Sequence, residues 1–376
     1  RPTDLDGVGK FARYHTFFEM LGNWSFGDYF KRETLTWGME FATEVLGIDR
    51  NRIWATVFGN HDEYPDDDEA YDIWVNEVGL PPERVIKLPD NWWGPVLETG
   101  ACGPDSEMYY DLGPEFGCGS PNCAPGCDCD RYLEFWNHVF TQYYKHADGS
   151  FTPLANKNID TGMGLERLTC VVQNKRHVYE TDLFAPIMQR VEEVITRATG
   201  SAGDKDDWRK RVIADHTRAA TFLVMDGIYP ANTGRGYVLR RIIRRAATFG
   251  FLLGIKQPFI HEIVPEVIDK MKTGYPDLVA KQDVILQQIR KEENQFGQTL
   301  DKGVPRFLER AQAGGIIDGH FAFDIYQTYG VPFEVMQELA AEYQASIDEE
   351  GYGNARDEHA AKSGKGSAIK ANFQAL

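Results

Sequence analysis

The sequence predicts a mixed domain, α/β or α+β, followed by an all-helical domain. Two observations support this. Short β-branched and aromatic runs typical of strands alternate with Gly- and Pro-containing turns in the first part of the chain. After about Leu183, apolar residues recur with the 3.6-residue period of amphipathic helices. We therefore expect a first domain over 1–181, a helical domain over 182–348 and a Gly-, Ser- and Lys-rich linker over 349–376.

Five elements are expected in the first domain from apolar patterning and turn residues. They are a strand–turn–strand over 14–21 and 24–26, a helix from Asp28 to about Leu46 that Gly47 ends, a strand over 52–58, a long irregular stretch over 90–130, and a strand over 131–144 that turns at 148–149. In the second domain, six helices are expected over 182–199, 207–226, 234–250, 257–272, 280–312 and 332–347.

Composition limits the class of protein. The chain has 376 residues, 42% of them hydrophobic, which is enough to bury a sizeable core. Its net charge of −17 argues against nonspecific binding to polyanions or membranes through bulk electrostatics. The longest apolar run, 246–255, is about half of what spans a bilayer. The chain starts Arg1-Pro2 without an initiator Met, so we expect a processed chain or a piece of a longer one.

The string 160–167, DTGMGLER, is the sharpest candidate for a site. Gly162 and Gly164 allow close approach of a ligand to the backbone where a strand ends and a helix begins. The N-terminus of that helix favours an anion, Arg167 adds a planar cation suited to phosphate, and Asp160 can hold an ammonium group. The alternative is a strand–helix turn with an Asp cap and an exposed Arg.

A second string, 13–30, begins with Arg13 and continues into aromatic residues. An arginine that leads into a hairpin, with aromatics beyond the turn, could grip a phosphate and stack on a base. The alternative is an aromatic-rich core hairpin.

The third string is basic. Residues 208–250 contain nine Lys or Arg and only two Asp, which gives a local charge of +7 in an acidic chain. A helix places four of these arginines on one face: Arg240, Arg241, Arg244 and Arg245. Four unpaired like charges reduce stability unless an anion meets them, so we expect binding to an RNA or DNA backbone. The alternative is a solvated face.

Four of the six cysteines fall within twelve residues: Cys118, Cys123, Cys127 and Cys129. This spacing between Gly and Pro turns suits a structural Zn²⁺ site, although Cys127 and Cys129 are unusually close for chelation. The alternative is four reduced thiols in an irregular insertion. Cys102 and Cys170 are expected to be packing residues. So few cysteines point to a reducing compartment, and we expect the cytoplasm.

These three strings, in this order, resemble the alanyl-tRNA synthetase family. Residues 13–33 resemble its class II motif 2, residues 160–167 its motif 3, and residues 211–245 its helical tRNA-recognition region. The resemblance covers roughly residues 5 to 350. It implies an α+β fold, with an antiparallel class II sheet flanked by helices and then a helical tRNA-recognition domain. It also implies an enzyme that makes alanyl-adenylate from alanine and ATP with Mg²⁺ and passes the alanyl group to the 3′ end of tRNA(Ala), with no DNA or membrane partner.

The resemblance also assigns roles. Arg13 would neutralise the α-phosphate of ATP. Arg167 would bind the γ-phosphate or pack on adenine, with Trp24 on the opposite face and Gly162 and Gly164 beside the nucleotide. Asp160, Asn137 and Trp93 would form the alanine pocket, and Glu107 is a candidate Mg²⁺ ligand. The residues implied in tRNA binding are Asn232, Arg235, Arg240, Arg241, Arg244, Arg245 and Gln327, of which Asn232 and Gln327 would read the acceptor-stem base pair.

The chain departs from the family pattern in three ways. The segment that carries motif 1 is missing, the editing domain and its zinc signature are missing with the C-terminal domain, and Gln327 stands where many members carry an acidic residue. We expect glycine and serine to be rejected imperfectly, because one methyl group is worth only ~1–3 kcal/mol. The alternative functions are an adenylate-forming ligase that charges another carrier, a tRNA-binding paralogue or fragment with little activity, and a zinc-knuckle scaffold.

Overall fold

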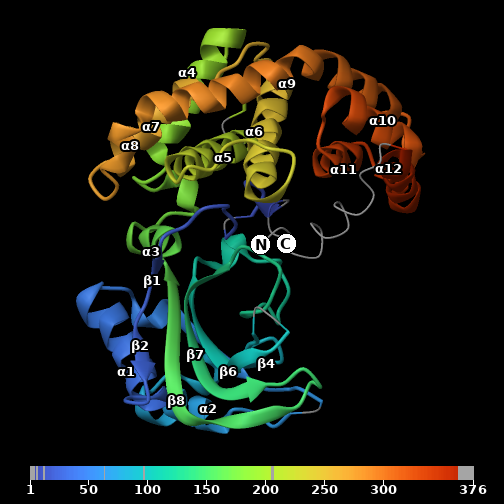
Figure 1. The fold of residues 1–376 in the computed structure, drawn as a ribbon. Coiled ribbons are helices and arrows are strands. Elements are labelled where there is room, and N and C mark those ends of the chain that lie inside the picture. The colour runs from blue at the N-terminus through green and yellow to red at the C-terminus, as the bar shows by residue number, and fades with distance from the viewer. Residues whose placement is uncertain are drawn as a thin grey trace. The chain divides into compact units, whose positions relative to one another are not determined.

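The computed structural model describes residues 5, 7–11, 13–62, 64–95, 98–204 and 207–362. The chain divides into two compact units, which are treated separately below (Figure 1). The sheet unit comprises Phe11–Arg13 and Phe18–Thr181. The helical unit comprises Asp182 onward, together with Tyr14–Phe17 and the chain up to Lys10. The expected first domain, 1–181, therefore contributes short N-terminal pieces to the helical unit.

The sheet unit is built on an eight-stranded sheet in the order β1-β8-β7-β6-β3-β4, with β2 paired to β8 and β5 to β6. The bounds are β1 Met20–Leu21, β2 Trp24–Phe26, β3 Ile53–Phe58, β4 Val85–Leu88, β5 Trp92–Trp93, β6 Gly100–Asp111, β7 Tyr132–Lys145 and β8 Phe151–Gly164. All pairs are antiparallel except β3–β4. Figure 1 shows the long strands β6, β7 and β8 side by side. The sheet and its helices confirm the α+β class.

The first expected strand pair is not a hairpin. β1 and β2 do not pair with each other; both pair with β8, as one edge strand interrupted at Gly22 and Asn23. A Cβ at Gly22 would lie 2.3 Å from the backbone oxygen of Thr161, so only glycine allows this approach. Asn23 closes the interruption, since its backbone N–H donates to Thr161 Oγ1 (2.8 Å) and its Oδ1 accepts from that hydroxyl (2.9 Å).

The stretch 90–130 is less irregular than expected. It contains β5 and the twelve-residue β6, and only the segment between Asp111 and Tyr132 is a long loop. The strand expected over 131–144 is confirmed as β7, and its turn contains Gly149 at φ +84°.

Short helices complete the sheet unit: α1 Lys31–Glu40, which continues as a π-helix over Phe41–Val45; α2 Asp68–Asp72, which continues as a π-helix over Ile73–Glu77; and α3 Leu165–Val172. Single 3₁₀ turns lie at Arg50–Arg52, Pro82–Arg84, Pro114–Phe116 and Val178–Glu180. The helix expected from Asp28 begins three residues later, because the Glu33 carboxylate accepts from the Phe30 backbone N–H (3.1 Å) and caps it there.

One face of the sheet is the core of this unit. The α1 residue Thr34 contacts His138 of β7 (Oγ1 to Nδ1, 3.2 Å), and Trp74 donates its indole N–H to Ser106 of β6 (2.8 Å). Burial lowers the pKa of His138 to about 3, so this ring is neutral. Since side chains alternate along a strand, the residues on either side of Ser106 and His138 project from the opposite face.

The helical unit contains α4 Ala185–Thr199, α5 Trp208–Met225, α6 Gly234–Leu252, α7 Ile260–Met271, α8 Asp277–Ala280, α9 Gln282–Ala311, α10 Gly319–Tyr329, α11 Phe333–Glu342 and α12 Glu349–Lys362, with a parallel pair β9 Gly315–Ile317 and β10 Ala345–Ile347. Five of the six expected helices are confirmed as α4, α5, α6, α7 and α9. The sixth, over 332–347, is divided into α11 and β10.

The expectation of a linker from residue 349 onward is wrong for residues 349–362. Glu349–Lys362 forms α12, whose Tyr352 is buried and stacks on Phe333 with ring centroids 4.0 Å apart. An apolar contact therefore overrides the Gly-rich composition. Residues 363–376 lie outside the described part of the chain.

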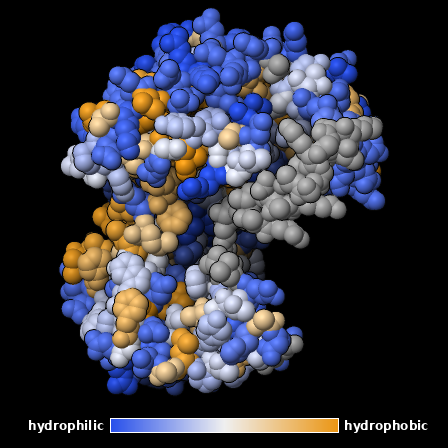
Figure 2. All heavy atoms as spheres, viewed as in Figure 1, coloured by the Kyte–Doolittle hydropathy of each residue, from blue (hydrophilic) through white to orange (hydrophobic). Residues whose placement is uncertain are grey.

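The distribution of apolar residues has two further features. Large apolar side chains are exposed along β1 and β2, including Met20, Trp24 and Phe26, and Figure 2 shows apolar residues gathered on that side of the sheet unit. Among the residues that the structure describes, no helix has the length and apolar character needed to cross a bilayer.

Candidate active site

The face of the sheet opposite α1 carries a row of polar side chains. In the strand register, Glu107 of β6 lies opposite Asn137 of β7, which lies opposite Gly162 of β8. Two positions further along the strands, and so on the same face, Asp105, Val139 and Asp160 are aligned in the same way. Because directly opposed residues of an antiparallel pair share a face, these side chains form one surface.

Carboxylates on this surface are buried, as is Asp105, or half-buried, as are Glu107 and Glu134, and they influence one another's pKa. Glu107 accepts hydrogen bonds from the Tyr109 hydroxyl (2.7 Å), Thr56 (3.3 Å) and the Asn137 amide (3.4 Å). Burial, and then the nearby charge of Glu134, raise the pKa of Glu107 to about 7. Such a carboxyl holds its proton near neutrality unless a cation arrives.

Asp105 is the second member of this acidic set. It accepts from the Asn91 amide (2.8 Å), and burial together with the charge of Glu107 raises its pKa well above the usual value. Sequence reasoning missed Asp105 because 90–130 was interpreted as irregular. Recognising a strand there would have placed it two positions from Glu107 on the same face.

Asp160 and Trp24 are brought together. They lie opposite each other in the β2–β8 pair, and the Trp24 indole N–H donates to Asp160 Oδ1 (2.8 Å). Trp24 remains 52% exposed. Nearby on β7, Asn137 Oδ1 is buried and has no hydrogen-bond partner among the residues that the structure describes. Asp160 and Asn137 therefore offer acceptors on one patch of the sheet.

Arg13 and Arg167 also meet, through the backbone of Arg13. The Arg167 guanidinium donates to the Arg13 carbonyl from Nε (3.2 Å) and Nη2 (2.9 Å), and it pairs with the Glu134 carboxylate (2.7 Å). The Arg13 side chain extends toward the cysteine loop, where Nη1 donates to the Cys129 carbonyl (3.4 Å). Glu134 is a partner that sequence reasoning did not identify.

The N-terminus of α3 differs from the expectation. The Leu165 N–H donates to the Glu19 carbonyl (2.9 Å), and the buried Glu166 carboxylate accepts from the Glu19 N–H (3.1 Å). The start of the helix is thus used to hold the chain beside β1. Gly164 itself is uncrowded, since a Cβ there would meet Arg167 at 3.9 Å, so a close ligand would explain this glycine better than internal packing does.

Trp93, the other residue implied for the alanine pocket, lies in β5 opposite Gly103 of β6, two residues before Asp105. It is partly buried.

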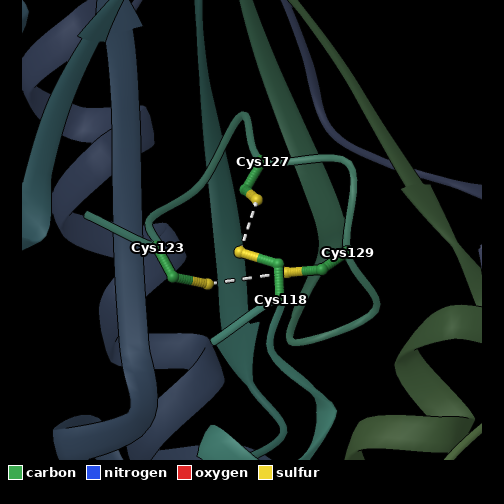
Figure 3. A group of neighbouring side chains, drawn as sticks. All are labelled: Cys118, Cys123, Cys127 and Cys129. Carbon is green, nitrogen blue, oxygen red and sulfur yellow. Dashed lines mark hydrogen bonds between the residues drawn. The ribbon is translucent and has the colours of Figure 1, made fainter. Parts of the chain in front are cut away.

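The four clustered cysteines converge on one point. Their sulfurs lie within 4.8 Å of one another, with Cys118–Cys127 and Cys123–Cys129 each at 3.5 Å (Figure 3). Tetrahedral zinc with bonds of about 2.3 Å places sulfurs about 3.8 Å apart, so the four thiols match this geometry closely. Cys102 and Cys170 are buried, as expected of packing residues.

In the helical unit, the premise of an unpaired arginine face on α6 is wrong. Arg240 and Arg244 both pair with Glu292 of α9 (3.2 and 2.8 Å). Arg241 pairs with Glu334 of α11 (3.3 Å). The carboxylates that pair with these arginines come from α9 and α11, which lie outside the segment 208–250 whose charge was counted.

Arg245 is the most deeply engaged of the four. Its side chain is fully buried, pairs with Glu338 of α11 (2.5 Å) and contacts His216 Nε2 (2.9 Å). Burial, in spite of the hydrogen bond with Asp215, lowers the pKa of His216 to about 4. Among the other residues implied in tRNA binding, Arg235 and Gln327 are exposed, and Asn232 is exposed and accepts from Arg240.

Comparison with known proteins identifies the family and agrees with the resemblance of the sequence strings. Residues 1–376 match the family model described as "tRNA synthetases class II (A)", and the chain belongs to that family. It is 47% identical to the alanine–tRNA ligase of Clostridioides difficile (strain 630) and 49% identical to that of Natranaerobius thermophilus, in both cases over 359 residues. These matches cover 94% of the chain and 40% of each relative, so the chain spans about two fifths of their length. A third relative, the alanine–tRNA ligase of Acetivibrio thermocellus, is 46% identical over 369 residues, 96% of this chain and 41% of its own length.

Proposed function

We propose that this chain activates alanine with ATP to alanyl-adenylate and transfers the alanyl group to the 3′ end of tRNA(Ala). The observation that carries the proposal is the single sheet face that joins Asp160 and Asn137 to the acidic set around Glu107, with Arg13 and Arg167 held together. The printed names of the relatives supply the amino acid and the tRNA.

The proposed alanine pocket consists of Asp160, Asn137 and Trp93. The carboxylate of Asp160 takes the substrate ammonium group, and the indole N–H of Trp24 fixes the orientation of that carboxylate. The unsatisfied Oδ1 of Asn137 is a second acceptor for the ammonium group. Trp93 would then close the pocket around the methyl group.

In the proposed ATP site, Arg13 meets the α-phosphate and Arg167 meets the γ-phosphate or the adenine. Trp24 offers its exposed ring to the nucleotide, and Gly164 leaves the backbone open to it. Gly162, also implied beside the nucleotide, is covered by Met20, since a Cβ there would lie 2.9 Å from Met20 Sδ. The alanine carboxylate is itself the nucleophile, so the residues contribute orientation and stabilisation of the charge that develops on phosphorus. Arg167 fixes the backbone of Arg13 for this task.

The acidic set fits a magnesium ion. Asp105 and Glu107 are oxygen donors, and burial together with neighbouring carboxylates raises the pKa of both, which a bound cation would offset. Mg²⁺ bound there would share the negative charge of the ATP phosphates. Hydrogen bonds from Asn91, Thr56 and Tyr109 hold the two carboxyls in place.

We assign tRNA contact to the exposed polar residues of the helical unit, Asn232, Arg235 and Gln327, together with Arg240. Arg241, Arg244 and Arg245, also implied in tRNA binding, would act on RNA by fixing α6 against α9 and α11. The four clustered thiolates would hold one structural Zn²⁺. Six free cysteines suit the reducing cytoplasm as the place of action.

The test is amino-acid-dependent ATP–pyrophosphate exchange across all twenty amino acids. A strong alanine signal with weaker glycine and serine signals is expected. The Asp160→Asn variant should lose exchange while it still binds tRNA, and Asp148→Asn, an exposed turn carboxylate at the end of β7, is the matched control. A protein that binds tRNA(Ala) but shows no exchange would instead be the tRNA-binding paralogue, and alanine-dependent exchange without tRNA charging would favour a ligase for another carrier.

A further inference from the structure

Arg13 is held from two directions within the sheet unit. Its backbone carbonyl accepts two hydrogen bonds from Arg167. Its guanidinium reaches the cysteine loop, where Nη1 donates to the Cys129 carbonyl (3.4 Å) and Nη2 lies 3.5 Å from the Asp128 carboxylate. The Arg13 side chain is 23% exposed, so it lies against the loop and not free in solvent.

The loop that holds Arg13 is anchored most firmly at its base, and the Tyr132 hydroxyl adds one hydrogen bond to the Cys123 carbonyl (3.1 Å). The Asp111 carboxylate takes a two-point ion pair from Arg131 (2.8 and 2.7 Å), and the Leu112 N–H donates to the Arg131 carbonyl (2.7 Å). Between these anchoring residues, the loop is mostly exposed or half-buried and rich in Gly and Pro, with Gly119 and Gly126 at positive φ. Such a segment has little apolar area to bury, so a bound metal would supply most of its order.

We propose that metal binding by Cys118, Cys123, Cys127 and Cys129 positions the Arg13 guanidinium for ATP, which makes the cysteine loop part of the adenylation machinery. This inference rests on the proposed function only for the role of Arg13. The loop would then be more than a stabilising insertion, because its metal state would set the rate of activation.

Two features link the metal to Arg13. Cys129 is both a ligand in the proposed cluster and the residue whose carbonyl accepts from Arg13, so fixing its sulfur also fixes that carbonyl. One Zn²⁺ with four thiolates carries a formal charge of −2, and Asp128 lies between two ligands. The loaded loop therefore attracts the guanidinium more strongly than four neutral thiols would.

The first experiment compares zinc-loaded and zinc-stripped protein by the rate at which phenylglyoxal labels individual arginines, read by peptide mass spectrometry. Zinc content is measured on the same samples, and one ion per chain is expected. Stripping should speed the labelling of Arg13 several-fold. Arg32, a 68% exposed arginine of α1, is the internal control and should not change.

The second experiment separates positioning from general stability by kinetics of alanine-dependent exchange. Loss of a hydrogen bond to a charged group typically changes a rate by about tenfold or more. Zinc removal should lower kcat on that scale and leave the KM for alanine unchanged, whereas Asp128→Asn should lower kcat only about twofold, because the Asp128 carboxylate is fully exposed. Glu115→Gln, an exposed carboxylate of the same loop, should behave as the unmodified protein, and added Zn²⁺ should restore the stripped protein.

The outcomes separate this inference from the proposed function. If zinc-loaded protein shows no exchange with any amino acid, the proposed function fails, while the labelling of Arg13 still reports its contact with the loop. If no zinc binds, or if stripping leaves Arg13 labelling and kcat unchanged, the positioning role is refuted. Equal acceleration of labelling at Arg13 and Arg32 would also refute it, because the metal would then only hold the unit folded.

Discussion

A buried carboxyl that holds its proton makes a stability prediction that needs no assumption about substrate. The pKa of Glu107 is raised from 4.5 to about 7, first by burial and then by the charge of Glu134. Replacing Glu107 by Gln keeps the size of the side chain and removes the titration. We therefore expect Glu107→Gln to change how the stability of the sheet unit depends on pH.

The sign follows from proton counting. Between pH 4.5 and about 7 the folded protein keeps a proton on Glu107 that the unfolded chain releases. The free energy of unfolding therefore falls as pH rises through this window, and the contribution is fully present only below it. The gap between the two pKa values corresponds to about 3 kcal/mol at pH 8. The Gln variant does not lose stability in this way as pH rises. The difference in unfolding free energy between the variant and the original protein should therefore shift in favour of the variant by about 3 kcal/mol between pH 4 and pH 8.

The assay is urea unfolding without Mg²⁺ at several pH values, followed by tryptophan fluorescence. Seven of the eight tryptophans belong to the sheet unit, so the signal reports on the unit that contains Glu107. Glu115→Gln, an exposed carboxylate of the same unit, is the control and should follow the original protein. Added Mg²⁺ should stabilise the original protein at pH 8 more than at pH 5, and this gain should shrink in Glu107→Gln.

Parallel pH profiles for the original protein and Glu107→Gln would refute the reasoning. They would mean that water reaches the carboxyl, or that Glu107 relaxes away from Glu134, so that the folded protein does not hold the proton. A Mg²⁺ effect of equal size in both proteins would separately remove Glu107 from the metal site.

Three further predictions concern other parts of the chain. Arg245→Gln should lower the stability of the helical unit by about 3 kcal/mol, because Glu338 loses its buried two-point partner and keeps the longer pair with Lys10 (3.6 Å). Circular dichroism should show most of this stability recovered in the apolar double variant R245M/E338L. Arg235→Gln should reduce the slope of log binding constant against log salt concentration for tRNA by about one unit, without changing stability. Arg290→Gln, at an exposed position of α9, is the control and should leave this slope unchanged. Equal slopes in all three proteins would exclude Arg235 from the RNA contact. Gly22→Ala should destabilise the sheet unit by at least ~2 kcal/mol, because its Cβ would collide with a backbone oxygen of β8; an unchanged urea midpoint would contradict this.

Long elements with a regular pattern could be predicted from sequence. β7 combines fourteen residues of aromatic and β-branched character, and helices such as α5 and α9 repeat their apolar positions over many turns. The motif strings also led to residues that the fold brings together, since Trp24 contacts Asp160 and Arg167 contacts the backbone of Arg13.

What could not be predicted depends on pairing between distant segments. Gly100, Gly103 and Pro104 favour a loop by local propensity, yet they lie in β6, where neighbouring strands fix the backbone. That error concealed Asp105. The short segments at Met20–Leu21 and Trp24–Phe26 read equally well as a hairpin, and only β8 decides that they form one interrupted edge.

The arginines of α6 show why a local charge count misleads. At about 100° per residue, positions i and i+4 share one side of a helix, and i+1 and i+5 share a side turned by about 100°. The first pair, Arg240 and Arg244, meets a single carboxylate on α9, Glu292.

The second pair, Arg241 and Arg245, meets Glu334 and Glu338 on α11, which are themselves four residues apart. Two adjacent i,i+4 arginine pairs can therefore pair with two neighbouring helices as well as with a phosphate backbone. A second segment of the chain with carboxylates four residues apart, such as Glu334 and Glu338, indicates pairing within the protein. Four arginines meet three carboxylates, because Arg240 and Arg244 share Glu292, so most but not all of their charge is neutralised within the protein. The RNA contact therefore depends mainly on the exposed residues outside these pairs, and for this reason Arg235 is more informative to mutate than Arg240.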